Sequence, residues 1–245
     1  MHPALKVVDH RPFPLPAGPW IMKQEWGDLL FAHWPLAPEY LRPLVPAELP
    51  LDTFDKQAWI AVTPFHMTGV RPRAVPPMPG LSAFPELNVR TYVRIANKPG
   101  VFFFSLDCAN APAVWGARTL YHLPYFRARM SVTIGNQGIV YSSQRVGERP
   151  AELHGTYGAV SHPFRATPGT LEHFLIERYC LYTVYKRQTY RADIHHVPWP
   201  LQNARATFAV NTMAAAAGVA LPDTDPLLHF AKHLEVLIWP LRRVS

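Results

Sequence analysis

One short stretch carries several of the residues that could do chemistry. Residues 86–93 read Glu-Leu-Asn-Val-Arg-Thr-Tyr-Val, so long polar side chains alternate with mainly apolar ones. A period of two places the two sets on opposite faces of a β-strand. A carboxyl, an amide, a guanidinium and a phenol on one face could bind a small polar molecule or transfer a proton to it. The polar members are Glu86, Asn88, Arg90 and Tyr92.

The next strand is expected to extend this polar face. Residues 97–100 read Asn-Lys-Pro-Gly, which is a turn signal. A symmetric turn predicts Arg90 opposite Asp107 and Tyr92 opposite Ser105, with apolar pairs on the other face. The polar face is either a solvated outer surface, as is common for antiparallel sheets, or the wall of a cavity.

A second alternating run covers residues 123–130. Tyr125, Arg127 and Arg129 fall on one face of the predicted strand. Two arginines two residues apart can clamp a carboxylate or a phosphate. They are equally consistent with surface arginines, or with ion-pair partners for Glu86 and Asp107.

The histidines and cysteines do not predict a metal site. His195 and His196 are neighbours on a predicted strand and point to opposite faces, so they are poorly placed to share a metal. The other pair with suitable spacing, His229 and His233, lacks the glutamate of a zincin motif. Both cysteines lie in apolar runs, which predicts buried free thiols.

No cofactor is expected either, because the chain has no glycine-rich phosphate loop, dinucleotide fingerprint or nucleophile elbow. Lys186 lies among tyrosines and could form a Schiff base if it were desolvated. Because Arg187 follows it, we instead expect Lys186 to lie in solvent at the end of the strand.

The composition excludes several classes of protein. The chain has 245 residues, 49% of them hydrophobic and 17% charged, with a net charge of +7. No Lys/Arg run is longer than two residues, as in Arg242-Arg243, so a nucleic-acid partner is not expected. There is no apolar run of 18 residues and no leader pattern. We therefore expect no membrane segment and a cytoplasmic location, and attraction to small anions fits the positive charge.

Strand signals dominate the rest of the chain, with a few short helices. A closed or nearly closed antiparallel β-barrel would remove exposed edges, so the predicted fold is mainly β (α+β). We expect one domain, 1–245, with a proline-rich N-terminal arm at 1–19 and a loop at 72–79 that could cover a cavity mouth. Hairpin turns are predicted at 55–57 and 135–138. Strands are predicted at 20–33, 57–69, 86–96, 101–109, 125–134, 139–146, 155–162, 180–187, 189–196, 202–211 and 233–240. Helices are predicted at Pro38–Leu44, Ala111–Tyr121 and Thr170–Arg178, the last capped by Thr170.

Several of these motifs resemble one known family. They are Phe31–Pro35, Leu81–Val93, Phe103–Asp107, Leu123–Met130 and Pro198–Gln202. The resemblance is to the YqjF-like bacterial proteins of unknown function, and it spans about residues 20–240. Through that family the chain resembles the acetoacetate-decarboxylase-like superfamily, which implies a barrel-like fold with a deep internal pocket. The resemblance therefore favours the cavity wall over the solvated surface for residues 86–92.

The resemblance also implies what is missing. Acetoacetate decarboxylases form an imine on a lysine that lies beside a second lysine, after a Gly-aromatic-Pro turn. The matching place here is Leu123-Pro124, followed by Tyr125 and Phe126, and neither can form an imine. Schiff-base decarboxylation is therefore not expected. The family glutamate that faces the lysine corresponds to Glu86 or to Asn88.

Three functions remain. The first is binding of a small carboxylate or other oxyanion metabolite, an organic acid, in an internal cavity. The second is a lysine-independent lyase, aldolase or hydratase, with Glu86 as general acid/base and Tyr125 as proton donor. The third is a structural or partner-binding protein in which the polar groups satisfy one another. A carboxyl group with a raised pKa that faces an open cavity would favour the second over the first. In the first, Arg90, Arg127 and Arg129 hold the anion, Tyr92 and Tyr125 bracket it, Asn88 lines the wall, and Glu86 and Asp107 orient the arginines.

Overall fold

The protein is a mainly β structure built on one twelve-stranded sheet. The computed structural model describes residues 2–136, 138–147 and 149–244. The strands are β1 (Met22–Leu36), β2 (Ala58–Pro72), β3 (Phe84–Ile95), β4 (Lys98–Cys108), β5 (Tyr125–Gly135), β6 (Gly138–Arg145), β7 (Glu152–Ala159), β8 (Cys180–Tyr185), β9 (Gln188–His195), β10 (Leu201–Asn211), β11 (Leu227–Ile238) and β12 (Arg242–Arg243). The helices are η1 (Pro3–Lys6), α1 (Pro38–Leu41), η2 (Arg42–Leu44), α2 (Ala111–Tyr121), α3 (Leu171–Ile176) and η3 (Ala215–Ala217).

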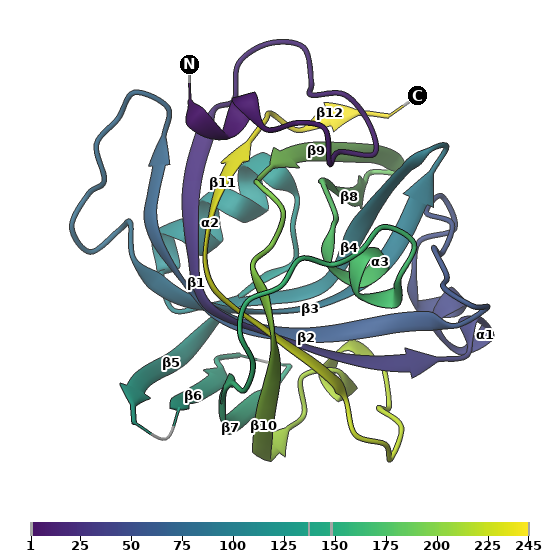
Figure 1. Ribbon diagram of the computed structural model, residues 1–245, viewed down its shortest axis with the longest axis vertical. Helices are drawn as coiled ribbons and strands as arrows, with labels where there is room; N and C mark the ends of the chain where they lie inside the picture. Colours follow the sequence, from purple (N-terminus) through teal and green to yellow (C-terminus); the bar gives the residue numbers. More distant parts are fainter. Residues whose placement is uncertain (1, 137, 148, 245) are drawn as a thin grey trace.

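The sheet returns on itself at two places. Its strand order is β12-β9-β8-β4-β3-β2-β1-β11-β10-β7-β6-β5, and β9 also pairs with β11 while β4 also pairs with β5. Two rings of strands result (Figure 1). The first ring, closed by β9 and β11, contains β1–β4, β8, β9 and β11. The second ring, closed by β4 and β5, contains β1–β7, β10 and β11, so the two rings share β1–β4 and β11. The mainly antiparallel prediction is confirmed for most pairings. It is wrong on one edge of β4, where β5 and β8 both pair in parallel.

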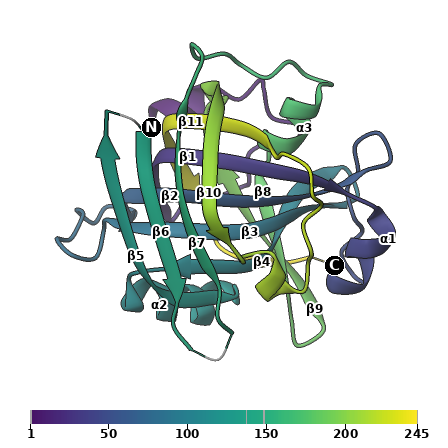
Figure 2. The same cartoon turned by 90° about the horizontal axis from the view of Figure 1, so that it is seen from below.

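The second ring adds a layer across the first. In Figure 2, β5, β6, β7 and β10 run side by side across β1, β2 and β3. Between these layers Leu87 and Val89 of β3 pack in a buried cluster with Tyr141 and Tyr157. The apolar face of the 86–93 run is therefore a core face. The polar face is also buried, so neither face of β3 is a solvated surface.

The hairpin of β3 and β4 differs from its predicted register. Its turn has two residues, because Ile95 pairs with Lys98, and Ala96 takes a left-handed conformation (φ 50°) that a tight turn needs. Arg90 consequently lies opposite Phe103. The predicted pairs Arg90 with Asp107 and Tyr92 with Ser105 are both wrong.

A β-bulge then changes which face the end of β4 presents. Val89 pairs with Ser105 and Arg90 with Phe103, which leaves Phe104 as an extra residue in β4. An extra residue reverses the side-chain alternation beyond it. Asp107 pairs with Leu87 and so lies on the face opposite to Arg90. No alternation in the sequence marks this bulge, because Phe102, Phe103 and Phe104 are identical.

Other predictions from the sequence are close to the structure. The bounds of α2 are as predicted, and Thr170 caps α3 through a hydrogen bond from the His173 amide. The turn at 55–57 is present, but β11 begins at Leu227, six residues before the predicted strand. The turn predicted at 135–138 contains Gln137, which lies outside the described residues, and Gly135 pairs with Gly138 across it.

The N-terminal arm packs against the sheet, and both cysteines lie in its interior. The N-terminal arm is tied to β9, since Arg11 donates to the Ile194 carbonyl at 2.8 Å and Ala4 accepts from His195 at 2.8 Å. Cys108 and Cys180 are buried free thiols. Within the described part of the chain, no helix has the length and apolar character needed to cross a membrane.

Candidate functional site

The first ring of strands surrounds a cavity of about 250 Å³. Strands β1, β2, β3, β4, β8 and β9 and helix α2 contribute to its wall. Most of that wall is apolar and aromatic, including Trp26, Phe65, Met67, Phe84 and Ile238. A mostly apolar, preformed cavity with a few polar groups is typical of small-molecule sites.

The polar part of the wall comes from β3. Glu86, Asn88 and Arg90 line the cavity, because residues two apart share a face and the other face is held by the second core. Tyr125 joins them from the first residue of β5, which pairs with Leu106 of β4. Four of the predicted site residues thus lie on one cavity wall.

Glu86 and Tyr125 form a buried pair. The Tyr125 hydroxyl donates to Oε2 of Glu86 at 2.8 Å, and the Glu86 side chain is almost fully enclosed. Burial raises the pKa of Glu86 to about 8, the hydrogen bond from Tyr125 lowers it in part, and the Asp107 carboxylate raises it. Burial and the charge on Glu86 also raise the pKa of Tyr125 well above its ordinary value. At neutral pH both groups are mainly protonated, so the pair can donate a proton or a hydrogen bond.

Arg90 is a buried cation without a carboxylate partner. Only 8% of the surface of Arg90 is exposed to solvent. No described carboxylate lies within 4 Å of its guanidinium. The group instead lies 5.2 Å from the ring centre of Phe31 and 5.9 Å from that of Tyr92. Cation–π contacts compensate only part of the cost of burying a charge. An anion in the cavity would supply the missing partner.

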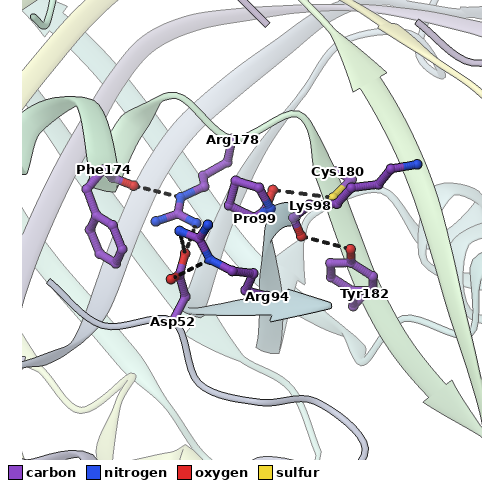
Figure 3. Close-up of polar contacts among 8 residues, drawn as sticks. All are labelled: Asp52, Arg94, Lys98, Pro99, Phe174, Arg178, Cys180 and Tyr182. Atoms are coloured by element: carbon purple, nitrogen blue, oxygen red, sulfur yellow. Dashed lines mark hydrogen bonds and ion pairs between the residues drawn. The ribbon is translucent and has the colours of Figure 1, made fainter. Parts of the chain in front are cut away.

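A second arginine on the cavity wall already has its partner. Arg178 follows α3, and its Nη1 donates to Oδ2 of Asp52 at 2.5 Å while its Nε donates to the Phe174 carbonyl at 2.6 Å (Figure 3). Arg94 binds the same carboxylate, with Nε 2.9 Å from Oδ1. Arg178 also lies 4.9 Å from the ring centre of Tyr92. This network fixes one end of the cavity and gives Arg178 a carboxylate partner, which it shares with Arg94.

The sequence did not indicate the Arg178–Asp52 pair. Asp52 lies in a loop and Arg178 is 126 positions further along the chain, so no local period connects them. Arg178 was predicted only as the last residue of a helix. Its place at the junction of that helix with the apolar strand β8 was the available signal for burial.

Several buried polar atoms on the cavity wall have no hydrogen-bond partner among the described residues. They are Thr63 Oγ1, Asn88 Oδ1, Arg90 Nε and Trp199 Nε1. Buried polar groups are normally paired with protein, water or ligand. The polar end of the cavity is therefore not a self-satisfied internal network.

Four other predicted site residues do not lie on the cavity wall. Tyr92 is fully buried behind it, with its hydroxyl 2.7 Å from Nε2 of His33. Asp107 faces the other core, where Arg145 binds both its oxygens at 2.7–3.1 Å. The bulge at Phe104 accounts for the change of face of Asp107, because it adds one residue to β4 between Phe103 and Asp107.

Arg127 and Arg129 are exposed on β5. Only the first three residues of β5 pair with β4, after which the strand leaves the cavity and pairs with β6. Arg127 and Arg129 therefore alternate in phase with Tyr125 along β5, but they lie in solvent whereas Tyr125 lines the cavity. The prediction that these two arginines converge on the cavity is wrong.

Lysine chemistry has no group to act through on this wall. None of the described residues that line the cavity is a lysine. Lys186 lies exposed in the turn between β8 and β9, with a left-handed backbone (φ 48°). The resemblance places Tyr125 and Phe126 at the positions of the lysine pair, and of these two Tyr125 lines the cavity.

The family of the chain follows from its sequence relatives. Residues 23–235 match the model of DUF2071, described as an uncharacterized conserved protein. The chain belongs to the DUF2071 family. It is 52% identical over 231 residues to the "Uncharacterized protein YqjF" of Bacillus subtilis (strain 168), and this match covers 94% of the chain and 96% of that protein.

Solved structures with the same fold are acetoacetate-decarboxylase-like. The acetoacetate decarboxylase of Legionella pneumophila is similar with a TM-score of 0.62 at 14% identity, covering 96% of this chain and 92% of that one. The enduracididine biosynthesis enzyme MppR complexed with pyruvate has a TM-score of 0.61 at 13% identity, covering 94% and 92%. At this identity the likeness establishes the fold and not the activity.

Proposed function

We propose that this DUF2071 protein binds a small organic acid, a carboxylate or similar oxyanion with an apolar part, in the cavity enclosed by β1–β4, β8 and β9. One observation carries the proposal. Arg90 is a buried guanidinium on the cavity wall with no carboxylate of the described residues within 4 Å. A bound anion would supply the charge-assisted hydrogen bonds that no described carboxylate makes to this guanidinium, including one to its unpartnered Nε.

The rest of the cavity suits such a ligand. Its apolar wall, including Trp26, Phe65 and Met67, would hold the apolar part away from water. Neutral Glu86 and Tyr125 would hold a second oxygen atom. A volume of about 250 Å³ is smaller than that of most drug-binding pockets, so the ligand is a small metabolite.

The fold and its neighbours add support. The ring of strands would act as a nearly closed barrel that keeps the ligand away from water, as the superfamily resemblance implies. One neighbour with this fold is a complex with pyruvate, itself a small acid. The proposal therefore includes a small organic acid as the ligand and the cytoplasm as the place of action.

A thermal-shift screen tests the proposal. Wild-type protein would be heated with pyruvate, acetoacetate, hexanoate and benzoate, and with the amide of each acid as the uncharged control. A ligand present at about 100 times its Kd adds roughly 2.7 kcal/mol to the free energy of unfolding. We expect at least one acid to raise the Tm and its amide to leave it unchanged. Equal shifts for acids and amides would contradict anion recognition.

Acid–base catalysis in the same cavity is the second candidate. The observation in its favour is that Glu86 lies on the cavity wall, bonded to Tyr125, with a pKa raised to about 8. A group with a pKa near the working pH is suited to proton transfer, as a lysine-independent lyase, aldolase or hydratase needs. Arg90 would hold the carboxylate while Glu86 and Tyr125 exchange protons with the substrate.

Hydrogen–deuterium exchange separates catalysis from binding alone. Each acid that passes the screen would be incubated with protein in D₂O, and its carbon-bound protons followed by NMR. Catalysis predicts exchange with wild-type protein and its loss in Glu86→Gln, which keeps the shape of the wall. Binding of the acid without exchange above the protein-free rate would exclude proton abstraction at carbon.

A further inference from the structure

A second hollow lies on the outside of the ring, along the edge of β4. The pairing of β4 with β8 ends at Phe102, and its pairing with β5 begins at Leu106. The residues between them pair with no described strand on this edge. The segment 122–124 fills the interval, since Leu106 donates to the Pro124 carbonyl at 3.0 Å and Thr183 donates to the His122 carbonyl at 2.9 Å. A groove of about 600 Å³ lies over this segment, and we call it the β4 groove.

The described charged side chains of the β4 groove are all basic. Arg118, Arg145 and Arg149 line it, and none of the described lining residues is acidic. Arg145 is buried and held by Asp107 beneath the groove, with its guanidinium 4.0 Å from the ring centre of Phe126. It therefore forms a fixed, neutralised part of the floor.

The other two arginines are exposed and not neutralised in this way. No described carboxylate lies within 4 Å of Arg118 or of Arg149. Arg118 is oriented by its own contacts, because its Nε donates to the Tyr125 carbonyl at 2.6 Å and its guanidinium lies 5.8 Å from the ring centre of Phe126. Its remaining N–H groups are available to an anion.

A buried hydroxyl is the second, independent observation. Ser105 lines the β4 groove and is 2% exposed, yet its Oγ has no hydrogen-bond partner among the described residues. The bulge at Phe104 places Ser105 on this side of β4, opposite Val89. A buried hydroxyl without a partner is rare in a native fold, and a ligand oxygen would satisfy it.

We propose that the β4 groove binds the phosphate group of a small phosphate monoester, with Arg118 and Arg149 on the dianion and the Ser105 hydroxyl at the floor. Two guanidinium groups and a hydroxyl match several oxygens that share two negative charges. Beside them His122 stacks on Tyr185, with ring centres 3.9 Å apart, and forms a flat wall for the organic part of the ester.

This site is separate from the internal cavity but adjacent to it. Phe103 and Leu123 line both hollows, so one layer of chain divides them. Arg90 and Glu86 do not line the groove. Binding in the groove therefore does not depend on the proposed organic-acid site, and failure of either proposal leaves the other standing.

An NMR titration tests the proposal. ¹⁵N-labelled protein would be titrated with ribose 5-phosphate and with inorganic phosphate at constant ionic strength, and with ribose as the control without phosphate. We expect saturable shifts of the amides around the groove with both phosphates and none with ribose. Absence of saturable shifts with either phosphate would overturn the proposal.

Four variants locate the binding. The double variant Arg118→Ala/Arg149→Ala should lose about tenfold or more in affinity for ribose 5-phosphate, and Ser105→Ala should lose affinity in the same direction. Arg129→Ala removes an exposed arginine of β5 outside the groove, and Arg90→Met removes the cavity cation, so both should bind as the wild type does. The removed arginines of the double variant are exposed, and its Tm checks its folding. An unchanged affinity in the double variant, or an equal loss in Arg129→Ala, would show non-specific attraction and refute the site.

Discussion

Glu86 and Arg90 lie four residues apart on one face of β3, and burial acts on them differently. Glu86 responds by taking up a proton, as its pKa of about 8 indicates. A guanidinium keeps its charge in proteins, so Arg90 remains a cation without a carboxylate within 4 Å among the described residues. Arg145 is the opposite case, since Asp107 binds it with both oxygens. We therefore expect Arg90 to bind a ligand and Arg145 to stabilise the fold.

Replacing each arginine by methionine should give opposite results. Arg90→Met removes an uncompensated charge, so the free energy of unfolding should change by less than about 1 kcal/mol or rise. Arg145→Met leaves the fully buried Asp107 without its partner and should cost about 3–5 kcal/mol. Urea denaturation of both variants measures this. A loss in Arg90→Met as large as that in Arg145→Met would mean that Arg90 belongs to a structural network.

Glu86 should make stability depend on pH. Its pKa is about 8 in the folded protein and near 4.5 when unfolded, so the folded state binds more protons between these values. Its contribution to stability is therefore complete below about pH 4.5 and is lost as the pH rises through 8. Relative to Glu86→Gln, the wild type should become less stable as the pH rises from 5 to 8.5. Parallel pH profiles of the two proteins in urea denaturation would refute the raised pKa.

Imine chemistry should be absent. Treatment with acetoacetate or pyruvate and then borohydride should leave no covalent adduct, because Tyr125 and Phe126 occupy the positions where the decarboxylase resemblance expects lysines. Intact-mass and peptide mass spectrometry measure this, with an acetoacetate decarboxylase as the positive control. An adduct that maps to one specific lysine, such as Lys186, would restore the Schiff-base mechanism.

At the scale of elements, the β3–β4 hairpin shows what alternation can and cannot predict. The period of two correctly grouped Glu86, Asn88 and Arg90, because β3 is regular and both its faces are buried. The position of Asp107 could not be predicted, because a two-residue turn and a bulge within three consecutive phenylalanines both change the register. Arg127 and Arg129 failed for another reason: parity describes a strand but not where that strand leaves the cavity.

The junction of β4 with β8 should be sensitive to a single methyl group. A Cβ on Gly100 would lie 2.7 Å from Sγ of Cys180 and 2.8 Å from the Cys180 carbonyl oxygen. Gly100→Ala should therefore force the two strands apart and cost about 1–3 kcal/mol. Gly116→Ala in α2 is the control, since its Cβ meets nothing within 4 Å and a helix favours alanine by about 0.5–1 kcal/mol. If the denaturation midpoint of Gly100→Ala is not lower than that of the wild type, the junction of β4 with β8 accommodates the added methyl group and the prediction is wrong.

At the scale of the whole molecule, the arrangement of strands explains why the cavity exists. The first ring keeps its inner face for the cavity, while the layer of β5, β6, β7 and β10 supplies a separate packed core on the other face of β1–β3. The mainly β class and the family were readable from strand periods and long motifs. The closing pairs β9–β11 and β4–β5, and the contact of Asp52 with Arg178, join distant segments that no local pattern connects.

The most direct test of the central claim is the affinity of the cavity for its acid with and without Arg90. Isothermal titration at pH 7 would compare wild type, Arg90→Met and Arg127→Ala, using the acid that gives the largest thermal shift. We predict that Arg127→Ala binds as the wild type does, because Arg127 is exposed outside the cavity. Arg90→Met should lose about tenfold or more, as expected for removal of a charged hydrogen-bond donor. Wild-type affinity in Arg90→Met, or the lack of any acid that binds the wild type, would contradict the account.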